Sequence, residues 1–260
     1  MKQRLDQLLV ALGHYPSRER AQAAIMAGLV RIGGEVASKA GQQVAADAAV
    51  EIVGQVHPYV SRGGLKLERA LDTFQIDPAG LYVLDAGAST GGFTDVLLQR
   101  GARHVVAVDV GYGQLAWSLR TDERVTVMER TNVRNLEVLP ERPALIVADL
   151  SFISLGKVFP AFAALLADGG QAVTLIKPQF EIGKGQAKGG VVRDPAQHRQ
   201  VLKGVRADGS TVGWGLVAVD HSPVKGPEGN IEFLGLWRPG AEPLSDEAIQ
   251  TVVAAAHNTL

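Results

Sequence analysis

Residues 82–93, which read YVLDAGASTGGF, contain the residue types of a nucleotide-like cofactor site. An apolar run ends at Asp85, small residues follow, and the pair Gly91–Gly92 begins a predicted helix. Glycines let the backbone approach a ligand closely, and the first turn of a helix offers unpaired N–H groups. A second apolar run (HVVAVD) ends in Asp109, about 20 residues further on, where a ribose hydroxyl needs an acceptor. The two runs predict a nucleotide-like cofactor.

The loop between these runs decides which cofactor is expected. It lacks the G-x-G-x-x-G pattern of dinucleotide-binding proteins. It has the form D-x-G-x-x-x-G-G, in which the loop surrounds the methionine part of S-adenosylmethionine and the second acid binds the ribose. We therefore expect S-adenosylmethionine, with Asn132 assigned to the adenine side on position alone. The expected cofactor-binding residues are Asp85, Gly87, Ser89, Thr90, Gly91, Gly92, Phe93, Asp109, Val110 and Asn132.

The same loop also has an alternative interpretation. Residues 87–91 (GASTG) fit G-x-S-x-G, the nucleophile elbow of α/β hydrolases. Asp149 and His221 follow Ser89 in the order that a hydrolase triad requires. A match of five residues is weak, and neither Asp85 nor Asp109 has a role in a hydrolase. S-adenosylmethionine is favoured, and a hydrolase that uses Ser89 is the alternative.

Four further polar residues lie where predicted elements begin or end. They are Lys66 in the first turn of a helix, Asp149 and Lys177 at the ends of two strands (ALIVAD and AVTLIK), and Glu232 on the last strand. A buried charge is costly unless it is paired. Each residue alone could equally be an exposed terminus, but two at the cofactor-side ends of adjacent strands point to catalysis.

Strands and helices alternate along most of the chain. The predicted strands are 81–85, 104–109, 124–129, 144–149 and 171–177, with helices from about 65 to 74, 93–100 and 155–166, and a closing hairpin-type pair at 213–220 and 231–236. This alternation predicts an α/β fold with a doubly wound, mostly parallel, Rossmann-like sheet that binds ligands at the carboxyl ends of its strands.

Two smaller expectations concern the same region. We expect Trp117, Trp214 and Trp237 to pack in the core or against the sheet. Residues 181–193 (EIGKGQAKGGVVR) are rich in glycine and lysine, which predicts a mobile surface loop that could also contact RNA phosphate.

The first fifty residues have a pattern of their own. Leu5, Leu8, Leu9 and Leu12 form the apolar face of a helix, and Ser17 is placed to cap a second helix. Short strands are expected near residues 29–32, 36 and 50–53. The pattern predicts a small α+β domain over residues 1–56, a linker over 57–64 and the larger domain over 65–260.

The N-terminal part is also mildly basic. Residues 1–66 hold eight Lys or Arg and five Asp or Glu, whereas the remainder holds 18 and 22. Charge alone favours a solvated surface, but the segment RLDQLLVALGHYPSRERAQAAIMAGLVRIGGEVASKAGQQV resembles the small RNA-binding module of ribosomal proteins and pseudouridine synthases. The resemblance implies RNA, contacted largely through shape and phosphate. The expected RNA-binding residues are Arg4, Arg18, Arg20, Arg31, Lys39 and Arg62.

Composition excludes several classes of protein. The 260 residues contain no cysteine, which rules out disulfides and zinc–thiolate sites, and the six histidines show no metal-ligand spacing. The apolar runs fall short of the roughly 20 residues of a membrane span, and no signal-peptide pattern is present. We expect a soluble cytoplasmic protein with no metal and no membrane contact.

Five motifs in order strengthen the functional hypothesis. SRGGLKL, DAGASTGGFTD, VADLSFISL, IKPQFE and GPEGNIEF, with the N-terminal module, resemble the TlyA (haemolysin A) family of ribosomal RNA methyltransferases. The catalytic domain of that family is similar to FtsJ-type RNA ribose 2′-O-methyltransferases. The resemblance implies methylation of a 2′-hydroxyl, of cytidine in the family, with ribosomal RNA or ribosomal subunits as partners. The name haemolysin leaves a non-enzymatic RNA- or membrane-active protein as a further alternative.

The resemblance also implies a Lys-Asp-Lys-Glu catalytic tetrad, matched by Lys66, Asp149, Lys177 and Glu232. Lys177 would position and deprotonate the hydroxyl, Asp149 would orient it near the methyl group, and the other two would complete the network. A free lysine, with a pKa of about 10.4, needs a neighbouring cation or burial to act as a base. The short N-terminus (MKQRLDQ) leans towards modification of the large-subunit RNA only.

Overall fold

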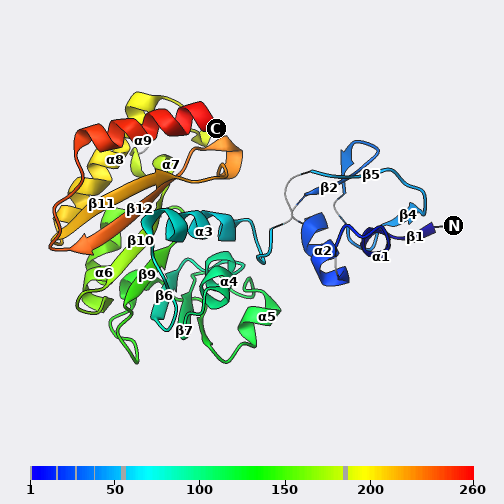
Figure 1. Ribbon diagram of the computed structural model, residues 1–260, viewed down its shortest axis with the longest axis horizontal. Coiled ribbons are helices and arrows are strands. Elements are labelled where there is room, and N and C mark those ends of the chain that lie inside the picture. The colour runs from blue at the N-terminus through cyan, green and yellow to red at the C-terminus, as the bar shows by residue number, and fades with distance from the viewer. Residues whose placement is uncertain (1, 16, 27, 38, 54–56, 184–186) are drawn as a thin grey trace. The chain divides into compact units, whose positions relative to one another are not determined.

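The computed structural model describes residues 2–15, 17–26, 28–37, 39–53, 57–183 and 187–260. The chain forms two compact units, Met1–Ser61 and Arg62–Leu260 (Figure 1). Residues 54–56, at the expected end of the first domain, lie outside the described residues.

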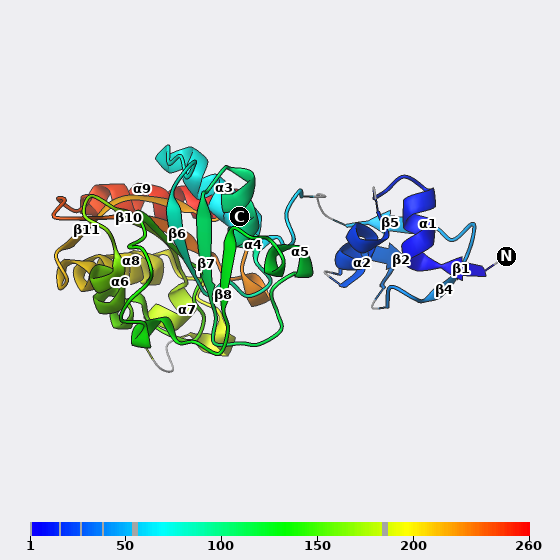
Figure 2. The same cartoon turned by 90° about the horizontal axis from the view of Figure 1, so that it is seen from below.

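The described residues of the first unit form two helices and two small antiparallel sheets, one pairing β1 with β4 and the other ordered β3-β2-β5. Helices α1 and α2 lie beside these strands (Figure 2). Leu5, Leu8 and Leu9 pack with Ile25 in the core of this unit, as the leucine spacing predicts, whereas Leu12, which was expected on the same face, is 51% exposed. The N–H of Arg20 donates to Ser17 Oγ at 3.3 Å, which confirms the predicted cap. The elements are β1 (Lys2–Arg4), α1 (Leu5–Ala11), α2 (Arg18–Met26), β2 (Val30–Ile32), β3 (Glu35–Val36), β4 (Gln43–Ala45) and β5 (Val50–Ile52).

The second unit contains a seven-stranded sheet in the order β11-β12-β10-β9-β6-β7-β8. Its strands are β6 (Tyr82–Ala86), β7 (His104–Val108), β8 (Val125–Met128), β9 (Leu145–Ala148), β10 (Gln171–Ile176), β11 (Trp214–His221) and β12 (Phe233–Pro239). Strands β6 to β10 pair in parallel, whereas β12 runs antiparallel to both β10 and β11. The predicted doubly wound sheet and its closing pair are thus confirmed.

Helices cover both faces of this sheet (Figure 1). The helices are α3 (Gly63–Phe74), α4 (Gly92–Gln99), α5 (Trp117–Arg120), α6 (Phe159–Leu165), α7 (Pro178–Glu181), α8 (Pro195–Ser210) and α9 (Asp246–Thr259), with short 3-10 helices at Val133–Asn135, Leu155–Lys157, Lys188–Gly190 and Pro227–Gly229. Leu84 and Ile146 face the core that α6, α8 and α9 cover. Side chains alternate along a strand, so Asp85 points to the opposite face, where Thr94 of α4 contacts it.

Of three expectations about local structure, the one for Trp117 was wrong, and the other two differ from the structure only in their bounds. Trp214 and Trp237 are buried, but Trp117 is 74% exposed, because it begins a four-residue helix whose buried residue is Leu119. The expected surface loop at 181–193 ends in buried Val191 and Val192, so it is anchored there; its residues 184–186 lie outside the described residues. The helix expected near residue 65 begins at Gly63.

Two further differences are small. The helix expected over 155–166 is a 3-10 turn followed by α6, and Glu232 precedes β12 rather than lying on it. No helix in the described part of the chain is long and apolar enough to cross a membrane.

Candidate active site

Four charged side chains from four elements meet beside the ends of β9 and β10. Lys177 Nζ lies 2.6 Å from Asp149 Oδ1, and Lys66 Nζ lies 2.6 Å from Glu232 Oε2. Lys66 Nζ also lies 4.0 Å from Asp149 Oδ2, and this contact connects the two pairs. All four expected catalytic residues therefore lie in one chain of alternating charge, ordered Glu232, Lys66, Asp149 and Lys177.

The topology of the sheet explains why these residues meet. β9 and β10 are parallel neighbours, so Asp149 and Lys177 follow them at the same edge of the sheet. β12 runs antiparallel to β10, and Ile176 pairs with Phe233. The start of β12 therefore lies beside the end of β10, which brings Glu232 to the edge where Lys177 lies.

The cluster is largely shielded from water. Lys66 and Lys177 are 7% and 8% exposed, and Glu232 is fully buried. Such burial is tolerated because each lysine has a carboxylate partner. A Cβ at Gly226 would lie 2.5 Å from the carboxyl carbon of Glu232, so any larger residue there would displace this carboxylate. The side chain of Asp149 is 22% exposed, and the cluster opens towards solvent at this residue.

A fifth residue of the cluster was missed in the sequence. Lys177 Nζ donates to Ser151 Oγ at 2.8 Å, so this lysine is held by a hydroxyl as well as by a carboxylate. Ser151 lies two residues after Asp149 in the motif VADLSFISL, and this proximity was the available signal.

An aromatic pair, formed by exposed Phe152 and half-buried Phe180, lies near the lysine. Phe152 is 90% exposed and has a φ of +62°, which is rare for a bulky side chain. Its ring centroid lies 5.0 Å from that of Phe180, and Lys177 Nζ lies 6.0 Å from the Phe180 ring. Strained backbone of this kind is concentrated at functional sites.

Asp85 is a fully buried acid in the expected cofactor loop. Its Oδ2 accepts a hydrogen bond from Thr94 Oγ1 at 2.6 Å, whereas Oδ1 has no hydrogen-bond partner among the described residues. Burial raises the pKa of Asp85 to about 7; the Thr94 bond opposes this shift and the charge of Asp149 adds to it. A buried acceptor without a donor fits a ligand that carries N–H groups. Thr94 was also missed in the sequence.

Two glycines shape the loop around this acid. Gly87 has a φ of +85°, and a Cβ there would lie 2.6 Å from the carbonyl oxygen of Asp149. Gly91, the N-cap of α4, has a φ of +96°, and a Cβ there would lie 2.9 Å from Leu115 Cδ1. Side chains at either position would fill the loop, so the glycines are required for its shape.

Asp109 holds the loop against β7. Its Oδ2 accepts from the N–H of Ser89 at 2.8 Å and its Oδ1 from the N–H of Gly111 at 2.6 Å. A small hollow lies here, and its polar lining includes Ser89 and Asp109, together with Gln114, which the sequence did not indicate. Val110, beside Asp109, is exposed.

The remaining expected cofactor residues are more scattered. Thr90 is exposed, whereas Gly92 and Phe93 are buried in the first turn of α4, so the ring of Phe93 belongs to the core. Asn132 Oδ1 accepts from the N–H of Arg134 at 3.1 Å and caps a 3-10 helix; it is not among the described residues that line the hollow.

The hydrolase triad is not assembled. Ser89 Oγ lies 3.3 Å from Gln114 Oε1, and Asp149 is bound by lysines. His221 Nδ1 lies 3.2 Å from Asp220 Oδ1 instead. Because the three groups have other partners, this alternative is not supported.

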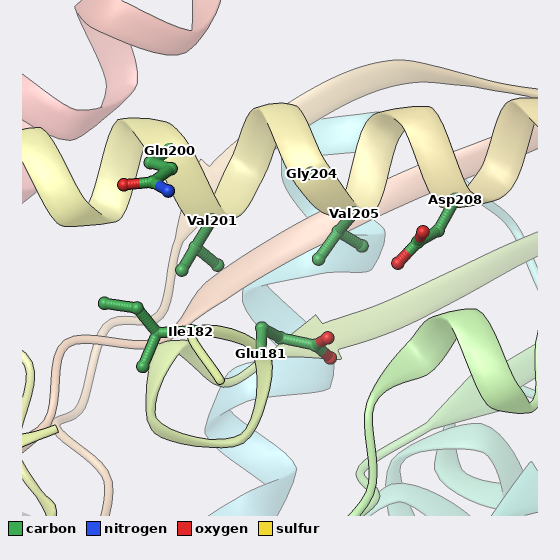
Figure 3. A pocket seen from close by; sticks show the side chains of 7 residues that line it. All are labelled: Glu181, Ile182, Gln200, Val201, Gly204, Val205 and Asp208. Atoms are coloured by element: carbon green, nitrogen blue, oxygen red, sulfur yellow. The ribbon is translucent and has the colours of Figure 1, made fainter. Parts of the chain in front are cut away.

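A larger cavity of about 190 Å³ lies between α7 and α8 (Figure 3). None of the four expected catalytic residues lines it. Burial raises the pKa of Glu181, whose Oε1 accepts from the N–H of Leu155 at 2.9 Å, so this acid already has a structural partner. The lining residues are Glu181, Ile182, Gln200, Val201, Gly204, Val205 and Asp208.

The expected RNA-binding residues have different environments. Arg4 and Arg18 both bind Asp6. Arg20 donates to the carbonyl oxygens of Pro58 and Tyr59 at 2.8 and 3.2 Å, so it holds the connector. The other three are Arg31 on β2, exposed Lys39, and Arg62 at the N-cap of α3.

Comparisons with known proteins identify the family of both domains. The model of FtsJ-like methyltransferases matches residues 59–238, and the S4 domain model matches residues 3–50. The 16S/23S rRNA (cytidine-2′-O)-methyltransferase TlyA of Mycobacterium tuberculosis is 51% identical over 90% of this chain and 88% of its own. YqxC of Bacillus subtilis, provisionally named an rRNA methyltransferase, is 45% identical over 100% and 95%.

A solved structure extends the likeness to three dimensions. A Streptococcus thermophilus protein that carries a provisional hemolysin name is 43% identical and superposes with a TM-score of 0.79, over 99% of this chain and 96% of its own. The expected fold class and family are thereby confirmed. The chain belongs to the FtsJ-like methyltransferase family, as a TlyA-type member in which an S4 domain precedes the methyltransferase domain.

Proposed function

We propose that this chain transfers a methyl group from S-adenosylmethionine to the 2′-hydroxyl of a cytidine in ribosomal RNA. The observation that carries the proposal is the contact between the glycine loop and the catalytic cluster. Gly87 packs against the carbonyl of Asp149, and the carboxylate of Asp149 lies 2.6 Å from Lys177 Nζ. A cofactor in the loop and a hydroxyl at the lysine would therefore be close neighbours.

The residues of the loop fit S-adenosylmethionine. The unpartnered Oδ1 of buried Asp85 suits the ammonium group of the methionine part, and the carboxylate of Asp109 suits the ribose hydroxyls. Gly87 and Gly91 leave the space that a side chain would fill. The cofactor, when bound, supplies a methyl group already activated by a sulfonium.

The cluster supplies the other half of the reaction. A ribose hydroxyl is a weak nucleophile, so its oxygen must be aligned with the methyl group and must lose its proton as the new bond forms. Lys177 Nζ, in its neutral amine form, accepts this proton, and Asp149 Oδ1, at 2.6 Å, stabilises the ammonium that results. Ser151 restricts the direction of Nζ. Lys66, paired with Glu232, balances the charge of Asp149 from the opposite side.

The aromatic pair supports a nucleic-acid substrate. Phe152 exposes nearly its whole ring next to the lysine. Unstacked bases bind to aromatic rings in this way, and RNA is commonly recognised through such bases. We therefore assign Phe152 and Phe180 to the base of the target nucleotide.

Labelled methyl transfer tests the proposal. The protein is incubated with S-adenosylmethionine labelled in the methyl group and, separately, with each ribosomal subunit and its naked RNA from cells that lack the gene. Label at the 2′-oxygen of a cytidine, mapped by mass spectrometry, is the expected result. The subunit that accepts label decides whether the small-subunit RNA is a substrate as well. No transfer to any of the RNAs, with the cofactor bound, would refute the proposed substrate.

Matched lysine variants test the assignment of the base. Lys177→Ala should lower transfer on the order of a thousandfold, because both alignment and proton removal are lost, while cofactor affinity is kept. Lys157→Ala, at an exposed lysine of the same unit, is the control and should retain activity. Retained methylation in Lys177→Ala would remove this residue from its assigned role.

A further inference from the structure

Asp6 is a fully buried carboxylate that binds two of the expected RNA-binding arginines. Arg4 donates through Nε to Oδ1 at 3.0 Å and through Nη2 to Oδ2 at 2.8 Å. Arg18 Nη2 also donates to Oδ2, at 3.3 Å. Gln22 Nε2 adds a bond of 2.7 Å. One carboxylate in the first turn of α1 therefore connects β1 to the start of α2.

The two arginines differ from Asp6 in their exposure. The carboxylate has no exposed surface, whereas the side chains of Arg4 and Arg18 are 40% and 48% exposed. A Cβ at Gly41 would lie 3.1 Å from Arg4 Nη1, so the chain also packs against the outer part of this guanidinium. Arg4 is thus fixed from two sides while part of it faces solvent.

A purely structural role explains this arrangement poorly. Buried ion pairs contribute little net stability, and an apolar residue often serves the fold equally well. One carboxylate is shared by two guanidinium groups, so the cluster keeps an excess positive charge at the surface. The bonds to Arg4 also hold the pKa of Asp6 well below its usual range, so the acid stays ionised. Excess charge held in fixed directions suits an anionic partner.

We propose that Asp6 is a positioning residue that holds Arg4 and Arg18 as a preformed pair of guanidinium groups for backbone phosphates of the RNA. The inference rests on the proposed function, since it assumes an RNA substrate. A planar guanidinium binds phosphate through two parallel N–H bonds only in the correct orientation. Because the carboxylate sets this orientation beforehand, less side-chain freedom is lost on binding.

The variant Asp6→Asn separates positioning from charge. Asparagine has nearly the same shape but removes a negative charge, so electrostatics alone would make RNA binding tighter. Loss of positioning should instead weaken binding by about tenfold, because two long side chains must then be ordered. Binding of the full chain to deproteinised total ribosomal RNA is measured by filter retention, together with kcat at saturating RNA, which should not change. Unchanged or tighter binding would overturn the inference.

A second background distinguishes positioning from a general loss of structure. In the variant Arg4→Gln/Arg18→Gln, the further change Asp6→Asn should not weaken binding, because the residues through which Asp6 acts are gone. Equal weakening in both backgrounds would assign Asp6 a structural role and overturn the proposal.

Arg4→Lys decides the question if Asp6→Asn does not fold. It keeps the charge and a partner for Asp6 but loses the planar fork, so binding should weaken by about fivefold. The control Arg31→Lys concerns an arginine with no carboxylate partner among the described residues, and it should bind more tightly than Arg4→Lys. Equal affinity of Arg4→Lys and the wild type would refute the inference. Wild-type protein that neither binds nor methylates ribosomal RNA would instead refute the proposed function.

Discussion

Replacing Asp85 by Asn should stabilise the cofactor-free protein at neutral pH while it removes cofactor binding. Burial raises the pKa of this acid from 3.8 to about 7. A difference of about 3 pKa units corresponds to about 4 kcal/mol of unfolding free energy, and the folded state loses this stability when Asp85 is ionised. Asparagine avoids the charge but leaves part of its amide unpaired, so we expect a net gain of about 2 kcal/mol.

The dependence of this gain on pH follows from the sign of the shift. The pKa is higher in the folded state, so the cost is present in full above about pH 7. It disappears below about pH 4, where Asp85 is protonated in both states. The gain in unfolding free energy from Asp85→Asn should therefore be large at pH 8 and small at pH 4.5.

Urea unfolding followed by tryptophan fluorescence measures this gain. All three tryptophans lie in the second unit, so the signal reports on the unit that contains Asp85. The control Asp168→Asn, at an exposed acid, should leave the urea unfolding curves at pH 8 and at pH 4.5 unchanged. A gain in stability that is the same at pH 8 and pH 4.5, or a loss of stability at pH 8, would refute the argument.

Calorimetry with S-adenosylmethionine should show no binding to Asp85→Asn. The affinity of the wild type should decrease as the pH is lowered below 7.

Three other variants test the cluster and its rim. Gly226→Ala should lower kcat on the order of a hundredfold, because the new methyl group displaces the Glu232 carboxylate, while the affinity for the cofactor is kept. Steady-state kinetics measures kcat, and calorimetry measures the cofactor affinity. Ser151→Ala should lower kcat by about tenfold with KM for RNA unchanged, since only Lys177 loses a bond, and a changed KM would contradict this. Phe152→Gly should raise stability by about 1 kcal/mol by relieving a positive φ, and should raise KM for RNA; lower stability in urea would count against strain there.

The order of elements could be predicted because the strands are nearly continuous apolar runs that end in polar residues. The runs before Asp85, Asp109, Asp149 and Lys177 each became a strand within one residue at the carboxyl end. Strand order could not be obtained in this way. The position of β12 between β10 and β11 depends on contacts between distant segments, and that position brings Glu232 to the cluster.

The helices that cover the face of the sheet with Leu84 and Ile146 were harder to predict. Helix α8 contains two glycines in a largely polar segment, and its buried residues Val201, Leu202 and Val205 are too few to give a clear period. Trp117 shows the opposite error, since a large apolar residue was assigned to the core from its type alone.

The expected catalytic residues came from motifs, whereas their partners came only from the fold. Ser151, Thr94 and Gly226 act through hydrogen bonds or close packing with residues that lie on other elements of the fold. A serine, a threonine or a glycine has many ordinary uses, so its type gives little signal. Asp6 is similar, because its two arginines meet only after β1 and α2 come together.

The pair Lys66–Glu232 joins residues 166 positions apart, one on α3 and the other directly before β12. During translation the chain emerges from its N-terminus, so the S4 domain and the cofactor loop are outside the ribosome well before Glu232 has been added. Closing so long a loop also makes this contact a late event in folding. A nascent chain can thus expose the arginines that we expect to bind RNA while it still lacks Glu232. The charged cluster can therefore close only after Glu232 has been added and has left the ribosome, later than the S4 domain and the cofactor loop.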